Sequence, residues 1–495
     1  MPLSIASQIQ RMAEAASNWK KRYKEERDVF PFAKEDETLF LPIRHFNSDH
    51  PVTPGEWTAI PYNIATQPRY ASGSRALPLQ PALVGGGYYI WHKGTGIAID
   101  PGHGFVDSLH RYHGITVHHI DVVIITHDHM DHHADLETII TLRRGGGSTR
   151  SRVLRIVTNQ QVNAAYALGD RARITDPDID VEVVQKGDLG RPIRLSNDIT
   201  ARFVPAAHWQ RVRTVFDGNT QLLPLQLVEG HLSALGVQIA MKRGRDVHRV
   251  LITGDTLWPV RRGSDWFAYD GANCCPYCDT QGKLKQFGWV TATLGPQKTA
   301  VADRVQEFCR DMVKAYRDLD LSDVICLHVG SIERSLATLS AGNGQEIVNR
   351  IDDAQSAYTG LHLGLLGSLR VLRTLSEAHT ADPTKGFDPG QGLVVLTEFG
   401  EELLGNRQNL CAVYKNLAER LLQRDGISVL PSEVTLRLRL DHANREVTPT
   451  QGVGCSYCES FHRWQESTAR EELGEIVTYM ASNPNTTHVN CAYWA

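Results

Sequence analysis

Short apolar runs recur along the middle of the chain and predict β-strands. The clearest is YYIWHKGTGIAID at residues 88–100, where two apolar runs flank the polar turn KGTG, as in a β-hairpin. Other apolar runs, bounded by polar or turn residues, predict strands at residues 121–126, 153–158, 180–184, 200–204, 237–241, 250–253 and 324–327.

Helical periodicity separates several of these strands, at residues 135–143 and 160–168. Strands that alternate with helices are typical of a layered α/β protein. A further amphipathic helix is predicted at residues 4–27, where apolar residues from Ile5 to Trp19 recur at spacings of three and four. We expect this helix to pack against the protein or to mediate homo-oligomerisation or contact with a partner protein.

Composition and charge exclude few classes of function. The chain of 495 residues is 41% hydrophobic and 22% charged, with a formal net charge of -4, so an anionic substrate would have to be met by a local basic patch. The first residues lack the pattern of a secretory signal, and no run approaches the roughly 20 apolar residues that span a bilayer. We therefore expect a cytoplasmic protein without stable membrane insertion, in which the nine cysteines are reduced or metal-bound.

The segment ITHDHMDHHAD, at residues 125–135, directly follows a predicted strand and is rich in metal-binding side chains. A solvated polar loop is the alternative interpretation, but the spacing His127-x-His129-x-Asp131-His132 disfavours it. His127 and His129 alternate along an extended segment and can point to the same side. Asp131 and His132 follow where the chain turns, which can direct them to a second ion.

Two later strands also end in candidate ligands. The run ARFVPAAHW ends at His208 and its neighbour, and HRVLITGDT places Asp255 after a strand. A carboxylate in that position could bridge two cations about 3.5 to 4 Å apart. Alone, His208 would more often be a surface or core histidine, but together with the first motif it is a candidate ligand.

In this order, Asp100-Pro101-Gly102, the His127 to His132 motif, His208 and Gly254-Asp255-Thr256 resemble the metallo-β-lactamase superfamily of binuclear metal hydrolases. The resemblance implies an αβ/βα four-layer sandwich. It also implies that His127, His129 and His208 hold one zinc, that Asp131 and His132 hold the second, and that Asp255 bridges them. On this basis we divide the chain into an N-terminal helix and wrapping extension (1–83), the metallo-β-lactamase-like domain (84–400, with a Cys-bearing insertion at about 259–300) and a C-terminal region (401–495).

Locally, PAAHWQRVRTVFDGNT and DVICLHVGSIER are similar to segments of the N-acylphosphatidylethanolamine phospholipase D branch. In that branch and in tRNase Z, a histidine opens a later helix, and a last strand carries the final metal ligand. The corresponding positions here are His362 and Glu398, so a carboxylate replaces the expected histidine. A carboxylate suits zinc or manganese but changes the charge of the site. We favour Glu398 as the final ligand, with His328 lining the pocket; the alternative is that His328 is the ligand.

The resemblance implies a metal-dependent hydrolase with two Zn²⁺ or Mn²⁺ ions, in which a bridging water becomes the attacking hydroxide. Asp131, His362 and His328 are the expected catalytic residues, and a histidine at position 362 could protonate a leaving alkoxide. We therefore favour a phosphodiesterase or nuclease. A helix-capping or core role for His362 remains open.

Two other functions stay open: hydrolysis of a lactone or other acyl bond, and a catalytically silent nucleotide sensor or scaffold. Among phosphodiesters, a nucleotide or nucleic acid is favoured over a lipid, because no lipid-binding apolar helix is evident. Residues that could contact such a substrate are Arg143, Arg144, Trp209 and Arg213, although an arginine run is more often a solvated face and tryptophan is normal in a core.

The sequences CCPYC (274–278) and GCSYC (454–458) share the form C-x-Y-C. Two such pairs are the usual way to build a tetrahedral thiolate site. We expect one structural Zn²⁺ that joins the insertion to the C-terminal region; a redox pair or unrelated free thiols are the alternatives, and Cys274 is a spare or competing ligand. The proposed ligands are Cys275, Cys278, Cys455 and Cys458.

Overall fold

The computed structural model describes most of the central part of the chain. The described residues are 38–42, 86–102, 104–145, 153–208, 233–262, 265–267, 298–330, 344–351, 362–399, 407–432, 436–442 and 446–451. The predicted N-terminal helix, both cysteine pairs, Trp209 and Arg213 lie outside these residues, so the predictions made for them stay predictions.

Two large sheets form the centre of the fold. The first has eight strands in the order β17-β16-β1-β2-β3-β4-β5-β6, and the second has seven in the order β15-β14-β13-β10-β9-β8-β7. The strands of the first sheet are β1 (Thr38–Pro42), β2 (Tyr88–His92), β3 (Thr95–Ile99), β4 (Val122–Ile125), β5 (Leu154–Thr158), β6 (Ile179–Val183), β16 (Leu436–Asp441) and β17 (Glu446–Gln451). Those of the second are β7 (Pro192–Arg194), β8 (Ile199–Ala206), β9 (Ala234–Arg243), β10 (Asp246–Ile252), β13 (Val324–Gly330), β14 (Leu393–Phe399) and β15 (Ser428–Pro431), and β11 (Val260–Arg262) pairs with β12 (Asp265–Phe267) as a separate ribbon.

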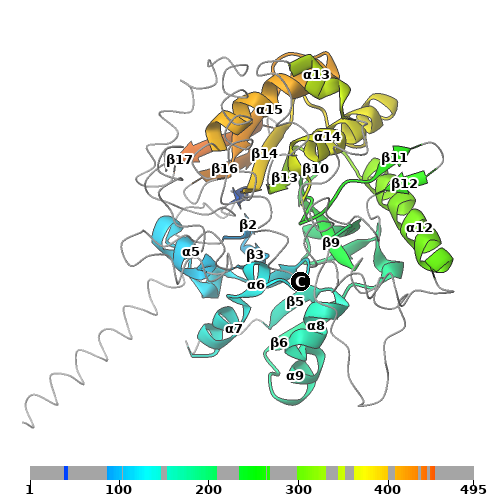
Figure 1. Cartoon of the computed structure of the whole chain (residues 1–495). Coiled ribbons are helices and arrows are strands. Elements are labelled where there is room, and N and C mark those ends of the chain that lie inside the picture. Colours follow the sequence, from blue (N-terminus) through cyan, green and yellow to red (C-terminus); the bar gives the residue numbers. More distant parts are fainter. Residues whose placement is uncertain are drawn as a thin grey trace, which may run out of the picture.

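Helices lie on the two outer sides, as Figure 1 shows, with the strands between them. One group covers the first sheet: α5 (Phe105–His113), α6 (Met130–His133), α7 (Leu136–Gly145), α8 (Gln160–Tyr166) and α9 (Leu168–Ile174). The other covers the second: α12 (Lys298–Arg317), α13 (Gly344–Asn349), α14 (Gly364–Ala381) and α15 (Arg407–Leu422). Two short 3₁₀ helices, η1 (Val117–His119) and η2 (Lys186–Asp188), complete the described elements. None of the helices in these parts of the chain is long and apolar enough to cross a membrane.

Each central strand is apolar on both faces, because each face meets a different layer. In β4, Val122 and Ile124 join the core between the sheets, whereas Val123 and Ile125 join the core under the helices. The pattern repeats in the second sheet, where Cys326 faces the inter-sheet core and the next residue, Leu327, faces the helices. A strand buried on both faces has a nearly continuous apolar sequence, as predicted for parallel strands. The predicted αβ/βα four-layer sandwich is therefore confirmed.

The predicted hairpin at residues 88–100 is formed by β2 and β3. Its two turn residues, Lys93 and Gly94, both have positive φ, 47° and 74°. Two such residues between antiparallel strands give the turn whose twist matches that of the strands. The turn is shorter than the predicted four residues, since β3 already begins at Thr95.

Segments from outside residues 84–400 complete both sheets. β1 pairs with β2 on one side and with β16 on the other, and β15 extends the second sheet beside β14. The described parts of the N-terminal and C-terminal regions thus belong to the sandwich, as strands and, in the C-terminal region, also as the helix α15.

A buried cluster of three histidines, His92, His248 and His442, lies at the start of β10. Thr38 Oγ1 is 2.7 Å from His92 Nδ1 and 2.9 Å from His442 Nε2, and His92 Nε2 is 3.0 Å from the carbonyl oxygen of Lys242. One proton arrangement satisfies these contacts with both rings neutral: His92 Nε2 donates to the carbonyl, Thr38 donates to His92 Nδ1, and His442 Nε2 donates to Thr38. Because Thr38 and His442 come from opposite ends of the chain, this basal histidine cluster ties β1 and the end of β16 to the rest of the sandwich.

Acid should weaken the fold through His442. Burial, followed by the nearby His248 and His92, lowers the pKa of His442 from 6.5 to about 4. The unfolded chain therefore binds a proton below pH 6.5 that the folded chain does not bind until about pH 4, so stability falls as the pH is lowered through this window, by up to about 2 kcal/mol. Denaturant unfolding with a chelator present should show a smaller loss for His442→Gln, whose amide can still donate to Thr38. The same pH dependence in both proteins would contradict this assignment.

Candidate metal centre

Five strands bring polar side chains to one edge of the sandwich. β8, β10, β13 and β14 run in the same direction in the second sheet, since β9 is antiparallel to both β8 and β10 and the others are parallel. The end of β4 joins this edge from the first sheet, because Leu235 N, in β9, donates to the carbonyl oxygen of Thr126. The residues at or after these ends are His127, His129, Asp131, His132, His208, Asp255, His328 and Glu398. The sheets therefore gather nearly every predicted ligand, as expected where strands share a carboxyl edge.

Three imidazole nitrogens and one carboxylate oxygen form the first group of donors. His129 Nδ1 is 3.0 Å from His127 Nε2 and 3.1 Å from His208 Nε2. Asp255 Oδ2 is 3.7 Å from His127 Nε2 and also 3.7 Å from His208 Nε2. Tetrahedral zinc with nitrogen ligands at about 2.0 to 2.1 Å separates its ligands by roughly 3.3 Å, so these four buried atoms have the spacing that one such ion requires.

The electrostatics of this group favour neutral imidazoles. Burial, followed by the neighbouring histidines, holds the pKa of His127 and of His129 well below the usual value. Both rings therefore keep free lone pairs at neutral pH, which is the form that binds a metal.

A second group of donors lies beside the first. Asp131, His132 and Glu398 are all buried, and each offers a ligand atom within 4.8 Å of the others. His132 Nε2 is 3.8 Å from Asp131 Oδ2 and 2.9 Å from Asp255 Oδ2. The two groups thus meet at Asp255, the residue that the sequence predicted to bridge two ions.

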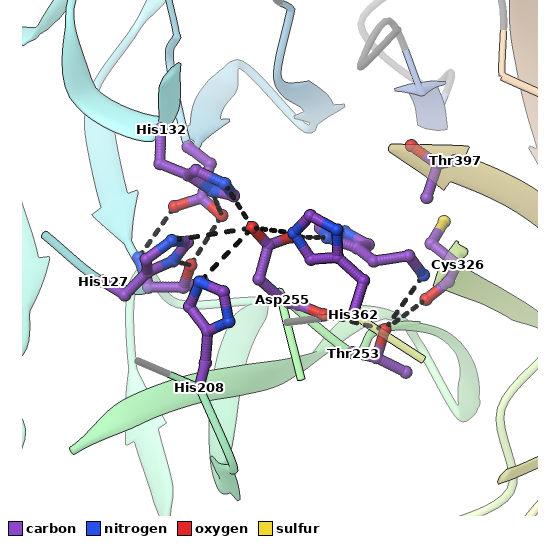
Figure 2. Close-up of polar contacts among 12 residues, drawn as sticks. His127, His132, His208, Thr253, Asp255, Cys326, His362 and Thr397 are labelled. Carbon is purple, nitrogen blue, oxygen red and sulfur yellow. Dashed lines mark hydrogen bonds and ion pairs between the residues drawn. The ribbon is translucent and has the colours of Figure 1, made fainter. Parts of the chain in front are cut away.

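The two oxygens of Asp255 have different partners. Oδ2 faces His132 and, at 3.1 Å, His362 Nε2, whereas Oδ1 is 2.6 Å from His328 Nδ1. Figure 2 shows the carboxylate between His127, His132 and His208 on one side and His362 on the other. Burial alone would raise the pKa of Asp255, but the charges of His132 and His362 hold it well below the usual range. Asp255 is therefore an ionised acceptor at the centre of the site.

Asp100, at the end of β3, positions one of the histidines from behind. Asp100 Oδ2 is 3.1 Å from His132 Nδ1, and Thr126 donates to both Asp100 oxygens, through its backbone N at 2.7 Å and its hydroxyl at 2.7 Å. A carboxylate that binds one ring nitrogen fixes the tautomer and points the other nitrogen at the metal position. Asp100 has a φ of 48° and Glu398 has a φ of 55°, an uncommon conformation that costs about 1 to 3 kcal/mol and is concentrated at functional sites.

His362 enters the site just before α14, as predicted for the helix-opening histidine. Its ring stacks on His208 with a centroid distance of 5.7 Å. Gly330, at the end of β13, makes this approach possible: a Cβ there would lie 2.4 Å from His362 Nδ1, and its φ of 66° favours glycine. The sequence indicated His362 but not the glycine that gives its ring room.

His328 and Glu398 are both at the centre, so the structure brings together both candidates for the final ligand. Each lies in a possible metal-binding group with Asp255, but only Glu398 also groups with Asp131 and His132. His328 has partners on both ring nitrogens, Asp255 on Nδ1 and the Tyr88 hydroxyl on Nε2 at 2.6 Å.

Other predicted residues lie elsewhere. Arg143 donates to the carbonyl oxygens of Val117 and Ile120, near the start of β4 rather than at its metal-binding end. The side chain of Arg144 is outside the described part of the chain.

Sequence reasoning missed several side chains that support the ligands. Tyr88 belongs to a strand that the sequence marked only by its apolar character, and Thr397 belongs to the strand that was singled out for Glu398 alone. No local signal identifies them, because their role depends on pairing between segments about 300 residues apart: the Tyr88 hydroxyl lies 3.1 Å from Thr397 Oγ1. Thr126, before the histidine motif, supports Asp100 and could have been suspected only from its position.

Adjacent histidines on α6 offer a matched test of the centre. His132 faces Asp255, whereas His133 is equally buried but contacts Asp128 Oδ1 at 3.0 Å and the Tyr166 hydroxyl at 2.7 Å. We expect His132→Ala to lose at least one bound divalent ion per chain in elemental analysis after loading and desalting, and His133→Ala to keep the wild-type content. Equal metal contents in the two variants would contradict the assignment of the second site.

The chain is similar to several known proteins. Residues 95–256 match the sequence model of the beta-lactamase superfamily domain. Similar solved structures include the metallo-beta-lactamase fold protein YhfI from Bacillus subtilis (13% identity, TM-score 0.40, 82% of this chain and 100% of that one covered). They also include yeast PDE1 (11% identity, TM-score 0.39, 81% of this chain and 98% of that one covered). A third is the short form of human tRNase Z (10% identity, TM-score 0.35, 80% of this chain and 96% of that one covered). A search of curated proteins found no match. The matched residues run from β3 through the histidine motif to Asp255, so this segment of the chain resembles the beta-lactamase superfamily domain.

Proposed function

We propose that this protein is a binuclear metal-dependent hydrolase that cleaves phosphodiester bonds. The observation that carries the proposal is the position of Asp255 Oδ2 between two groups of buried donors, one of three imidazoles and one that contains Asp131, His132 and Glu398. A shared carboxylate between two such groups is the arrangement that holds two cations in hydrolytic sites.

The donor sets support different ions in the two positions. Three neutral imidazoles and one carboxylate suit Zn²⁺. The second position has one imidazole with the carboxylates of Asp131 and Glu398, and this harder set accepts Mn²⁺ as well as Zn²⁺. Two divalent cations with Asp131, Asp255 and Glu398 leave the centre with a net charge of about +1, which still favours an anionic substrate.

When bound by these residues, divalent cations would lower the pKa of a coordinated water toward neutrality and so supply the nucleophile. The chain supplies the other groups. Asp100 and Asp255 orient the imidazoles, and His362, in contact with Asp255 Oδ2, is placed to give a proton to the leaving oxygen. We propose a nucleotide or nucleic acid as the substrate class, with Trp209 and Arg213, which directly follow His208 in the sequence, as candidate contacts to base and phosphate.

The role of His362 predicts a dependence on the leaving group. An alkoxide needs a proton as it departs, whereas p-nitrophenolate departs without one. We expect His362→Gln to lower kcat by about 10² to 10⁴ for a dinucleotide diester. For bis-p-nitrophenyl phosphate the expected loss is less than about tenfold, because general-acid catalysis contributes little there. His133→Gln serves as the buried-histidine control, and equal losses for both substrates in His362→Gln would exclude the general-acid role.

The choice of bond is tested with the metal-loaded wild-type protein on diesters, a lactone and a thioester. Turnover of diesters that is abolished by Asp131→Ala supports the proposal. Turnover of the lactone or thioester with inert diesters would replace it by acyl-bond hydrolysis. If no substrate is turned over and fewer than two ions bind, the chain is instead a silent member of the fold.

A further inference from the structure

Tyr88 reaches from the first sheet across the inter-sheet core to the metal-binding edge of the second. It lies in β2, is fully buried, and stacks on Phe40 with a centroid distance of 6.0 Å. Its hydroxyl is 2.6 Å from His328 Nε2 and 3.1 Å from Thr397 Oγ1. His328 and Thr397 are register partners in the neighbouring strands β13 and β14. The Tyr88 hydroxyl, in an apolar core, is therefore close to two candidate metal ligands. One of its partners, Thr397, is adjacent in sequence to Glu398, and the other, His328, contacts Asp255.

The positions of the hydrogens in this series of contacts can be assigned by starting from Asp255. Asp255 is ionised and accepts, so His328 Nδ1 carries the hydrogen that it donates to Oδ1 across 2.6 Å. In the neutral imidazole, Nε2 then has the lone pair, which accepts from the Tyr88 hydroxyl. The Tyr88 oxygen in turn can accept from Thr397. The order Thr397 to Tyr88 to His328 to Asp255 leaves every group satisfied without placing a second charge in the core.

Removal of the Tyr88 hydroxyl would disturb the orientation of the His328 ring. Without the hydroxyl, His328 Nε2 is a buried lone pair that has lost its donor, so the ring is no longer held on that side and can turn, which lengthens the hydrogen bond from Nδ1 to the Asp255 carboxylate. The Asp255 carboxylate would then lose the contact that fixes Oδ1. Its orientation would change, and Oδ2 would move from its position among the metal ligands. Outer contacts of this kind typically change metal affinity by about 10- to 100-fold.

We propose that Tyr88 is a positioning residue of the metal centre: through His328 it fixes the orientation of the Asp255 carboxylate and so sets the affinity for the bound ions. This inference rests on the binuclear centre under Proposed function. It also explains why a tyrosine stands at an inter-sheet position of β2, where Ile90, the next residue on that face, is apolar.

The next residue provides a matched control. Tyr89 is also fully buried in β2, but it faces the helix-covered core and donates to the carbonyl oxygen of His119 at 2.8 Å. Tyr88→Phe and Tyr89→Phe each remove one hydroxyl from a buried, hydrogen-bonded tyrosine. Both keep their rings packed, so their effects on melting temperature should be similar.

Affinity is measured by competition of Zn²⁺-loaded full-length protein with a chromophoric chelator. We expect Tyr88→Phe to bind its weaker ion at least tenfold less tightly than wild type, within the range for outer contacts, and Tyr89→Phe to stay within about twofold. The visible absorption of the Co²⁺-loaded protein should shift in the first variant and not in the second. Similar affinities and spectra for both variants would overturn the inference.

A second variant separates positioning from a general loss of structure. In His328→Asn, the side-chain amide can donate to Asp255 at the position of Nδ1 without help from Tyr88. We therefore expect Tyr88→Phe to change affinity by less than about twofold in that background, and an undiminished tenfold effect would contradict the relay. If wild type itself binds fewer than two ions, the binuclear centre fails; if it binds two but Tyr88→Phe behaves as Tyr89→Phe, only the inference about Tyr88 fails.

Discussion

The contact between the Asp255 carboxylate and a ring of buried imidazoles is the interaction on which the site depends. One oxygen of this carboxylate faces four histidines, from the ends of β4 and β8, from α6 and from the residue before α14, and the other oxygen is held by His328. Taking these groups out of water is costly unless each has a partner of opposite polarity. Asp255 meets part of this cost because its carboxylate faces several imidazole nitrogens, and bound cations would add the attraction that the converging lone pairs require.

The sandwich makes this concentration of polar groups possible. Both sheets are apolar on both faces, so the strands are held by two cores at once and their ends are placed with little freedom. Ligands at strand ends inherit that precision. The same rigidity supports the positive-φ conformations of Asp100 and Glu398, which a loop of low stability would relax.

The two sheets also differ in what they contribute to the centre. The first sheet and its helix α6 supply His127, His129, Asp131 and His132, which form a nearly local unit supported by Asp100. The second sheet supplies His208, Asp255, His328 and Glu398 from four separate strands. Tyr88 carries hydrogen bonds from the first sheet to the ligand-bearing strands β13 and β14. The metal centre thus combines residues of both sheets, and its geometry depends on how the sheets pack against each other.

The sequence by itself determined the fold class, most strands, the local motif from His127 to His132 and its partners His208 and Asp255, because short-range periodicity and ligand spacing are properties of neighbouring residues. It could not determine that β1, β15, β16 and β17 complete the sheets, since strand pairing joins residues up to 400 positions apart. It left His328 and Glu398 as alternatives, and only the tertiary structure placed both beside Asp255 with different partners. It also gave no sign of Tyr88 or of the contact between Thr38, His92 and His442. A buried tyrosine or histidine is defined by what lies across the core from it, and that is decided when the sheets pack together.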